Sequence, residues 1–434
     1  MENTTVRRLM KYLDASPSCY HATENLKKRL LDSGYQLLRE SEVWKLQHGG
    51  KYVVIRNDSS LIAFRIPAEV TGGFMMAAAH SDFPALKLRE ATETESGGTL
   101  VLTTEPYGGM IFSSWMDRPL SVAGRVMTDE DGCLRTRLVN VDRDLLVIPN
   151  VAPHMNRSIN DGAALKPNVD LRPVMGTADD KGKLRAMVAE AADVKEEDIL
   201  SSELFLYPRI RGTLVGAEEQ YILSPRLDDL QCAFTCTEGF LRAAESRSIP
   251  VLCVFNNEEV GSGTLQGANS DFLGNVLKRI SQAMGRTEEA HLAALAESFM
   301  VSADNAHAVH PNHPEYADVN EKVTINGGVA VKFNANQKYS TDAVSAAVFR
   351  RICRMADAPV QSYSNRADMP GGSTLGNISI TRVSVPTVDV GLPQLAMHSA
   401  CELAGVEDTE HMARIMEIYF SCTLRRAADG GILL

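Results

Sequence analysis

The sequence predicts an α/β protein whose mostly parallel central sheet is flanked by helices, with a smaller β-rich region inserted into it. First, short apolar runs typical of strands buried on both faces alternate with long helical stretches near both ends of the chain. Second, the middle of the chain has Thr- and Gly-rich alternating stretches, which are typical of a separate set of strands. We therefore expect a discontinuous α/β domain of residues 1–91 and 225–434, interrupted by residues 92–224.

The first segment predicts two helices, a hairpin and a buried strand. Apolar residues recur at helical spacing on both sides of the Ser16-Pro17-Ser18 break. Asn57-Asp58 is a turn signal between two β-branched and apolar runs, which indicates a hairpin. The predicted elements are helices at 6–13 and 26–31, strands at 51–55 and 61–66, and a buried strand at 73–79 that ends at His80.

The insertion and the last segment differ in their sequence patterns. The insertion predicts strands at 99–103, 121–127 and 145–148, and one charged, Ala-rich helix within 179–197. After Pro225 long helices again alternate with buried runs, as in an α/β domain. The elements expected there include a helix at 227–246 and strands at 251–255, 299–302, 329–333 and 385–390.

Composition narrows the class of protein. With 434 residues, 44% of them hydrophobic, the chain is long enough for two or three domains and can bury a core. Its 44 basic against 55 acidic residues give a net charge of -11, which disfavours nucleic acid and anionic lipid as partners. The eight cysteines include no CxxC pair, and we find no signal core or membrane-spanning run. These observations predict a cytoplasmic protein.

Polar side chains follow directly on several of the predicted buried strands. The carboxyl ends of parallel strands meet at one edge of a sheet, where open α/β proteins bind their ligands. We therefore expect these side chains to gather in one place. They are His80 and Asp82 after 73–79, Glu258 and Glu259 after 251–255, Asp304 after 299–302, and His398 after 385–390.

The residue types predict a catalytic metal site. Two imidazoles and several carboxylates without a thiolate suit zinc, cobalt or manganese in an open site. Asp228, at the start of a helix in SPRLDDL, could bridge two ions. Asp228, Asp304, Glu259 and one bridging hydroxide would balance the charge of two divalent ions. Glu258 then remains as the general base, and Asp82 is placed to orient the ligands or tune Glu258.

Each of these residues also has a structural interpretation. Asp228 could be a helix N-cap, Asp304 a turn residue, and His398 a histidine satisfied by a backbone carbonyl. The HAVHPNH segment (His307, His310 and His313) contains two prolines that break a helix, so we expect it to line the site or lie on the surface. The joint pattern, rather than any single residue, carries the metal-site hypothesis.

Two further motifs narrow the chemistry. The GGSTLG run at 371–376 lacks the Lys-Ser or Lys-Thr of a phosphate loop, so it predicts a close backbone approach. Neither HExxH nor GxSxG occurs, which disfavours zincin and serine-hydrolase mechanisms.

Several motifs in order resemble those of the aspartyl aminopeptidase family of dinuclear zinc exopeptidases. The resemblance extends from about Ser16 to the C-terminus. Two positions depart from the family pattern: Asn257 stands where histidine often precedes the two glutamates, and Cys19 where proline is common. The motifs are SPSCYHATENL, AAAHSDFPALKLRE, SPRLDDL, FNNEEVGSGTLQGANS, SADNAHAVHPNHPE, KFNANQKYSTDA and PTVDVGLPQLAMHSACELAG.

The resemblance implies a role for each candidate residue. One ion would be bound by His80, Asp228 and Asp304, and the other by Asp228, Glu259 and His398, with zinc expected and cobalt or manganese as alternatives. Glu258 would be the general base. Family likeness also implies that residues 92–224 form a dimerisation domain and that the protein assembles into a tetrahedral dodecamer with interior active sites. Lys332 and Tyr339 would lie near the substrate's acidic side chain, and His154 would reach a neighbouring subunit's site.

We therefore expect a cytoplasmic metalloaminopeptidase that releases N-terminal Asp or Glu from short peptides. A preference for neutral residues is an alternative, because relatives with this ligand set also cleave those. A deacylase or carboxypeptidase on the same scaffold is another, since fold and metals do not fix which end of a substrate is bound. The intact ligand set disfavours a non-catalytic scaffold.

Overall fold

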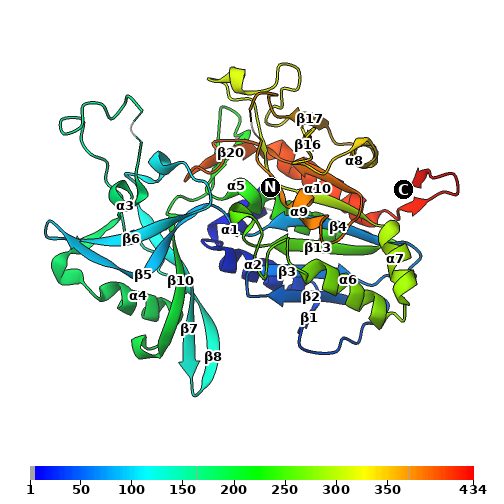
Figure 1. Cartoon of the computed structure of the whole chain (residues 1–434), viewed down its shortest axis with the longest axis horizontal. Coiled ribbons are helices and arrows are strands. Elements are labelled where there is room, and N and C mark those ends of the chain that lie inside the picture. Colours follow the sequence, from blue (N-terminus) through cyan, green and yellow to red (C-terminus); the bar gives the residue numbers. More distant parts are fainter. Residues whose placement is uncertain (1–4, 163, 370) are drawn as a thin grey trace.

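The computed structural model describes residues 5–162, 164–369 and 371–434, so residues 1–4 of the predicted first segment lie outside the described part. Among the described residues the strands form three larger sheets and a two-stranded pair, β21 (Arg425–Arg426) with β22 (Ile432–Leu433). Figure 1 shows a region of helices packed around one sheet on the right and a region dominated by strands on the left. The predicted α/β fold with an inserted β-rich region is confirmed.

A nine-stranded sheet forms the centre of the larger region. Its middle strands β13, β4, β14 and β18 are parallel to one another, while β3 and β16 run antiparallel beside them. All seven residues of β4 are buried, as its unbroken apolar sequence predicts. The order is β1 (Gln36–Leu38), β2 (Lys51–Arg56), β3 (Ser60–Arg65), β13 (Ile249–Phe255), β4 (Phe74–His80), β14 (Phe299–Ala303), β18 (Thr387–Gly391), β16 (Val329–Phe333) and β17 (Val360–Ser364).

Helices cover both faces of this sheet. Successive strand side chains point to opposite faces, so Met75 and Ala77 of β4 join one core while Met76 and Ala78 join the other. The first core includes side chains from α1 (Thr5–Asp14), α2 (Cys19–Asp32), α5 (Leu227–Arg242), α8 (Ala343–Met355) and α10 (Val406–Ser421). The second includes α6 (Phe272–Ala283), α7 (Glu288–Ala296) and α9 (Leu375–Ser379). None of the described helices is both long enough and apolar enough to cross a membrane.

A six-stranded antiparallel sheet with its own core forms the second region. Leu86, Val122 and Leu206 of the sheet pack with Leu184 and Val188 of α4 (Lys183–Ala192). The strand order is β8 (Cys133–Asn140), β7 (Leu120–Glu130), β10 (Ile199–Pro208), β5 (Ala85–Ser96), β6 (Thr99–Tyr107) and β9 (Val174–Thr177), with α3 (Pro167–Asp170) nearby. The sheet therefore draws on residues between Ala85 and Pro208, and the division into domains stays a prediction.

The predicted elements differ from the structure at many of their ends, and three of them are clearly shorter or more weakly formed than expected. The helix expected within 179–197 is confined to α4, because Gly182 and Asp193 at its two ends adopt left-handed backbone angles. The strand expected at 145–148 makes only isolated bridges, Leu120 to Leu146 and Val147 to Val174. The helix expected at 227–246 ends at Arg242, where Ala243 leaves the helical conformation.

A five-stranded sheet, which the sequence did not predict, contains residues from both regions of the chain. Its strands are short, so their sequences carry little periodicity. The order is β11 (Thr213–Val215), β12 (Tyr221–Ser224), β20 (Glu402–Gly405), β19 (Pro393–Leu395) and β15 (Ala306–His307). β12 leads into α5 and Asp228, and β19 and β20 flank His398, so this sheet positions two of the predicted site residues.

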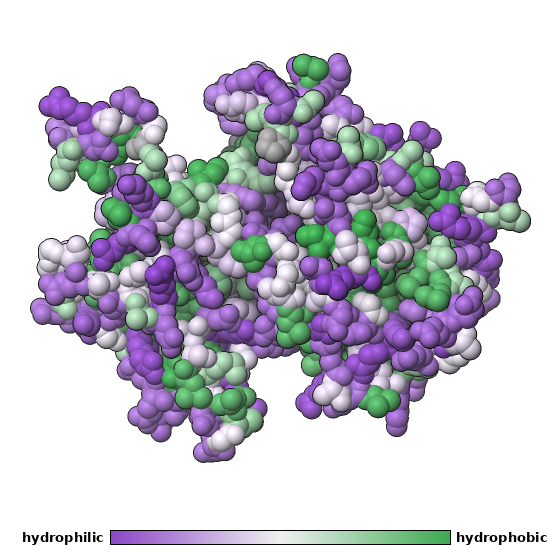
Figure 2. Space-filling model, viewed as in Figure 1, coloured by the Kyte–Doolittle hydropathy of each residue, from purple (hydrophilic) through white to green (hydrophobic). Residues whose placement is uncertain are grey.

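The surface in the view of Figure 2 is largely hydrophilic, with apolar residues in scattered patches. The loop between β8 and α3 projects from the six-stranded sheet at the upper left of Figure 1. It exposes apolar side chains, including Met155, which is 83% exposed, and Val151.

Candidate active site

The predicted ligands gather at the carboxyl ends of the four parallel strands β13, β4, β14 and β18, which are neighbours in the sheet. They line a cavity of about 440 Å³. The sheet brings together side chains that are up to 318 positions apart in the sequence, from His80 to His398. The lining includes His80, Asp228, Glu258, Glu259, Asp304, Lys332, Tyr339 and His398.

His80 is held by its own strand and by two aspartates. Its backbone N–H donates to Oδ2 of Asp229 (3.0 Å), and its Nδ1 donates to the backbone carbonyl of Asp82 (3.0 Å). Nε2 therefore faces the cavity, 3.8 Å from Oδ1 of Asp228 and 4.0 Å from Oε2 of Glu258. A histidine whose other nitrogen is fixed by a carbonyl is oriented as metal ligands usually are.

His398 is held in a loop by a buried glutamate. It adopts a left-handed backbone conformation (φ 66°), and its N–H donates to Oε1 of Glu402 (2.7 Å). The other oxygen of Glu402 accepts from the N–H of Asp228 (3.1 Å). Nε2 of His398 lies 3.2 Å from Oδ2 of Asp228 and 3.3 Å from Oε1 of Glu259. The two oxygens of Asp228 thus face different histidines.

Asp82 holds the two adjacent glutamates by their backbones. Oδ1 accepts from the N–H of Glu258 (3.1 Å), and Oδ2 accepts from the N–H of Glu259 (3.2 Å) and from the Tyr107 hydroxyl (2.6 Å). Asn257, which precedes the glutamates, donates from Nδ2 to the Tyr107 hydroxyl (2.9 Å) and adopts a left-handed conformation that asparagine tolerates well. Asp82 is thus placed to orient the ligands.

Three overlapping groups of side chains could each hold an ion, with the ligand atoms of a group within 4.8 Å of one another. Asp228, Glu259 and His398 form one group, which is the set expected for the second ion. His80 belongs to the other two, one with Glu258 and Asp304 and one with Asp228 and Asp229, rather than to the expected trio with Asp228 and Asp304.

The donor set fits divalent cations. Oδ1 of Asp228 and Oε1 of Glu259 are buried and accept no hydrogen bond from the described residues. Buried carboxylate oxygens normally have a donor or a cation as partner. Nitrogen and oxygen ligands without sulfur suit zinc in a catalytic site, and cobalt and manganese as well.

The shifted pKa values of the site residues also favour bound divalent cations. Burial raises the pKa of Glu259 to about 7, although contact with His398 opposes the shift. Burial disfavours a charged His398, but its contacts with Asp228 and Glu259 outweigh burial and raise its pKa to about 11. Burial, reinforced by the carboxylates of Asp304 and Glu259, raises the pKa of Glu258 well above its usual value. Divalent cations would compensate this excess of buried carboxylates and displace the proton of His398.

The three expected substrate-binding residues lie in different settings. Lys332 is buried, with Nζ 3.3 Å from Oδ1 of Asp304 and donating to the carbonyl of Asn305 (2.8 Å). Nζ also lies 5.6 Å from the centre of the Tyr339 ring. His154 is exposed in the projecting loop and is not among the described residues that line the cavity of its own chain.

The HAVHPNH motif both lines the site and reaches the surface, as its sequence predicted, while GGSTLG contributes to the cavity wall. His307 lines the cavity, and the imidazole of His313 is 52% exposed and pairs with Glu315. Gly372, Ser373 and Thr374 contribute another wall of the cavity.

Sequence reasoning missed two residues that hold the ligands, Asp229 and Glu402. Asp229 directly follows Asp228, and nothing in the local sequence separates the roles of the two aspartates. Glu402 follows His398 by four residues in an otherwise apolar run, and a buried acid in such a run was the available signal. Its burial raises its pKa to about 8.

Histidines and carboxylates that converge at the carboxyl edge of a parallel sheet indicate a metal-dependent enzyme with an α/β fold. A family model described as "Aminopeptidase I zinc metalloprotease (M18)" matches residues 12–420. The chain therefore belongs to the M18 family of zinc metalloaminopeptidases, as the motifs predicted.

Relatives match over almost the whole chain. A probable M18 family aminopeptidase 2 of Clostridium novyi (strain NT) is 40% identical over 422 residues, which cover 95% of this chain and 98% of the relative. The structure of Chaetomium thermophilum mApe1 is similar, with a TM-score of 0.87, 27% identity and 96% of each chain covered. The S. cerevisiae mApe1 dodecamer has a TM-score of 0.84 and 25% identity, with 95% of each chain covered.

Proposed function

We propose that the chain is a dinuclear aminopeptidase that releases N-terminal Asp or Glu from short peptides, with Glu258 as its general base. The observation that carries the proposal is the position of Asp228, whose two oxygens face His80 and His398 separately. This arrangement suits a carboxylate that bridges two ions. Peptide bond hydrolysis by such a pair needs a neighbouring base, and Glu258 lies beside His80 in the cavity.

His80, Asp228 and Asp304 would hold one zinc ion, and Asp228, Glu259 and His398 would hold the other. When bound, such ions polarise the scissile carbonyl and lower the pKa of water. The carboxylates around them would also attract the free amine of a peptide, which selects substrates by their N-terminus.

Glu258 would move the proton during hydrolysis. Its carboxylate would accept a proton from the attacking water and deliver it to the departing amine. A raised pKa supports both halves of this role, because the group must hold the proton briefly and then release it. Asp82 would keep Glu258 in position through the backbone hydrogen bond at 3.1 Å.

Lys332 supports a preference for substrates with an acidic N-terminal residue, whereas its contacts with neighbouring residues support a preference for neutral ones. Its buried ammonium lies in the cavity beside Tyr339, where it could pair with the carboxylate of a substrate side chain. It already pairs with Asp304, however, so part of its charge is neutralised. The two preferences are separated by comparing Asp, Glu and Leu p-nitroanilides, and a clear preference for Leu would refute the acidic assignment.

A dodecamer is the assembly we propose. The similarity to the S. cerevisiae mApe1 dodecamer supports it, and so does the projecting loop with exposed Met155. His154 lies in that loop and could reach the cavity of a neighbouring subunit. Residues 92–224 would supply the dimer contact. The mass of the purified protein in solution tests this assembly.

Metal analysis of the purified protein together with hydrolysis of a dipeptide panel tests the whole proposal. We expect two ions per chain and release of the N-terminal residue. Acetylating the peptide N-terminus separates the alternatives, because an aminopeptidase should then stop while a deacylase need not. Hydrolysis that survives acetylation would contradict the proposal.

A further inference from the structure

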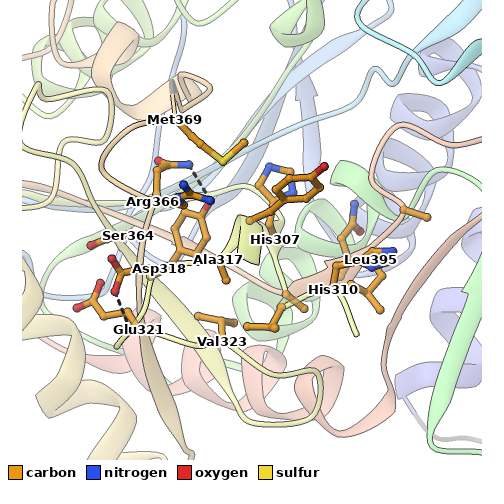
Figure 3. Close-up of a pocket in the computed structure, with 17 residues that line it drawn as sticks. His307, His310, Ala317, Asp318, Glu321, Val323, Ser364, Arg366, Met369 and Leu395 are labelled. Atoms are coloured by element: carbon orange, nitrogen blue, oxygen red, sulfur yellow. Dashed lines mark hydrogen bonds between the residues drawn. The ribbon is translucent and has the colours of Figure 1, made fainter. Parts of the chain in front are cut away.

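A second cavity of about 320 Å³ opens beside the catalytic one, and the two share His307 and Tyr363 in their walls. We call it the His307 pocket. Figure 3 shows His307 near its middle, with Asp318 and Glu321 on one side and Leu395 and His310 on the other. Its apolar walls include Val309, Ala317, Val323, Met369 and Leu395. No step of the proposed chemistry uses this pocket.

The chain itself leads from the catalytic centre to the pocket. Asp304 through His307 form one continuous wall of the catalytic cavity, and His307 also lines the pocket. Three residue steps of extended chain cover about 10 Å. That is the length of the two or three residues of a peptide that would follow a scissile bond placed at the metal site.

The backbone at His307 is suited to binding an extended peptide. β15 is an edge strand, and the N–H groups of Ala306 and Ala308 both donate to β19, at the carbonyls of Leu392 and Gln394. Alternate residues of a parallel strand face opposite sides, so the N–H and C=O of His307 point away from β19. The carbonyl of Asn305 already accepts from Nζ of Lys332, and the N–H of Val309 donates to the carbonyl of Val323. An extended peptide can therefore pair with this edge at His307 alone.

The pocket carries an excess of negative charge. Asp318 and Glu321 line it, and Oε2 of Glu321 is buried with no hydrogen-bond donor among the described residues. Arg366 also lines it, but its Nε pairs with Asp368 outside the pocket at 2.7 Å. The remaining carboxylates favour a cationic side chain with an apolar stem, as in lysine or arginine.

We propose that the His307 pocket binds the part of a peptide that follows the scissile bond and that it prefers a basic residue there. The inference rests on the proposed aminopeptidase function and adds a substrate class to it. Selection would then act at both sides of the cleaved bond.

The test uses tripeptides that share the same N-terminal residue and carry Lys, Leu or Glu at the second or third position. For the wild-type enzyme we expect KM for the best lysine peptide to be about fivefold or more below that of its glutamate counterpart, the size expected for partly exposed charge pairs. In Asp318→Asn/Glu321→Gln this ratio should approach one, with the largest change in KM for the lysine peptide. The double variant Asp179→Asn/Glu289→Gln makes the same charge change at exposed sites away from the pocket and should keep the ratio.

The outcomes separate the two levels of the proposal. Absence of N-terminal release from every peptide would overturn the aminopeptidase function and this inference together. Release with equal KM for lysine and glutamate peptides, or a preference that survives in the pocket variant, would overturn the pocket assignment alone. Asp318 accepts from the N–H groups of Asn320 and Glu321, and asparagine keeps that acceptor. If Asp318→Asn/Glu321→Gln does not fold, Glu321→Gln alone must bring the KM values of the lysine and glutamate peptides closer together.

Discussion

His80 and His398 lie on opposite sides of Asp228, and the fold holds them by different means. His80 ends a central strand, and its side chain is 1% exposed, whereas His398 lies in a loop with its side chain 31% exposed. His80 is held by the pairing of β4 with β13, by the Asp229 carboxylate that accepts from its N–H, and by the Asp82 carbonyl that accepts from its Nδ1. The loop is held at His398 by the carboxylate of Glu402, which accepts from its N–H, and by the N–H of Ile111, which donates to its carbonyl (3.1 Å). One half of the site is thus built into the sheet, and the other is a loop held by a buried carboxylate and one backbone hydrogen bond.

The largest effect is expected at the proposed general base, Glu258. Glu258→Gln should lower kcat by about 10²- to 10⁴-fold while both ions stay bound, because the amide cannot accept the proton of water. Steady-state kinetics and metal content measure the two outcomes. Glu259→Gln is the matched control, since it should lose metal as well as activity. A near-normal rate for Glu258→Gln would remove this residue from the base role.

Removing the loop histidine should empty one half of the site. His398→Ala is expected to lower the affinity for one ion by about 100-fold or more, because even groups that only support a ligand contribute about 10- to 100-fold to metal affinity. The ion beside His80 should stay. Chelator competition with metal analysis measures both affinities, and His313→Ala, at an exposed histidine, is the control. Retention of two ions at wild-type affinity would contradict the assignment.

Glu402→Gln tests how much the loop half depends on its buried carboxylate. The amide keeps one acceptor but turns its NH2 group toward an N–H donor, of either Asp228 or His398. We expect about a 10- to 100-fold loss of affinity for the ion at His398 and a smaller loss at His80, whose ion would share Asp228. The same chelator titration applies, with the exposed Glu407→Gln as control. Equal weakening of both ions would show that the two halves are not held separately.

The smallest effect is expected on the strand side. Tyr107→Phe removes the 2.6 Å hydrogen bond to Asp82, but that carboxylate keeps its contacts with the N–H groups of both glutamates. We expect the activation free energy to rise by about 1 kcal/mol, which is roughly a fivefold lower kcat, with both ions retained. Loss of an ion in this variant would mean that the strand half is no better supported than the loop half.

The strand half of the site could be foreseen from the sequence more readily than the loop half. A run such as 73–79 has one natural place in an α/β protein, so the position of His80 at the strand end follows from local pattern alone. His398 could be placed near the site only through its distance from 385–390. The strands that flank it, β19 and β20, are three and four residues long, and so short a strand carries no reliable periodicity.

The sequence by itself determined the central strands, the residues that follow them, the cation class they suit and the family to which the chain belongs. These depend on apolar periodicity and on residue type, which are local properties. Tertiary structure alone decided that Glu402 holds two ligands, that Lys332 pairs with Asp304, and that a second acidic pocket adjoins the first. Such contacts join residues far apart in the chain, so they exist only once packing has fixed the distances between them.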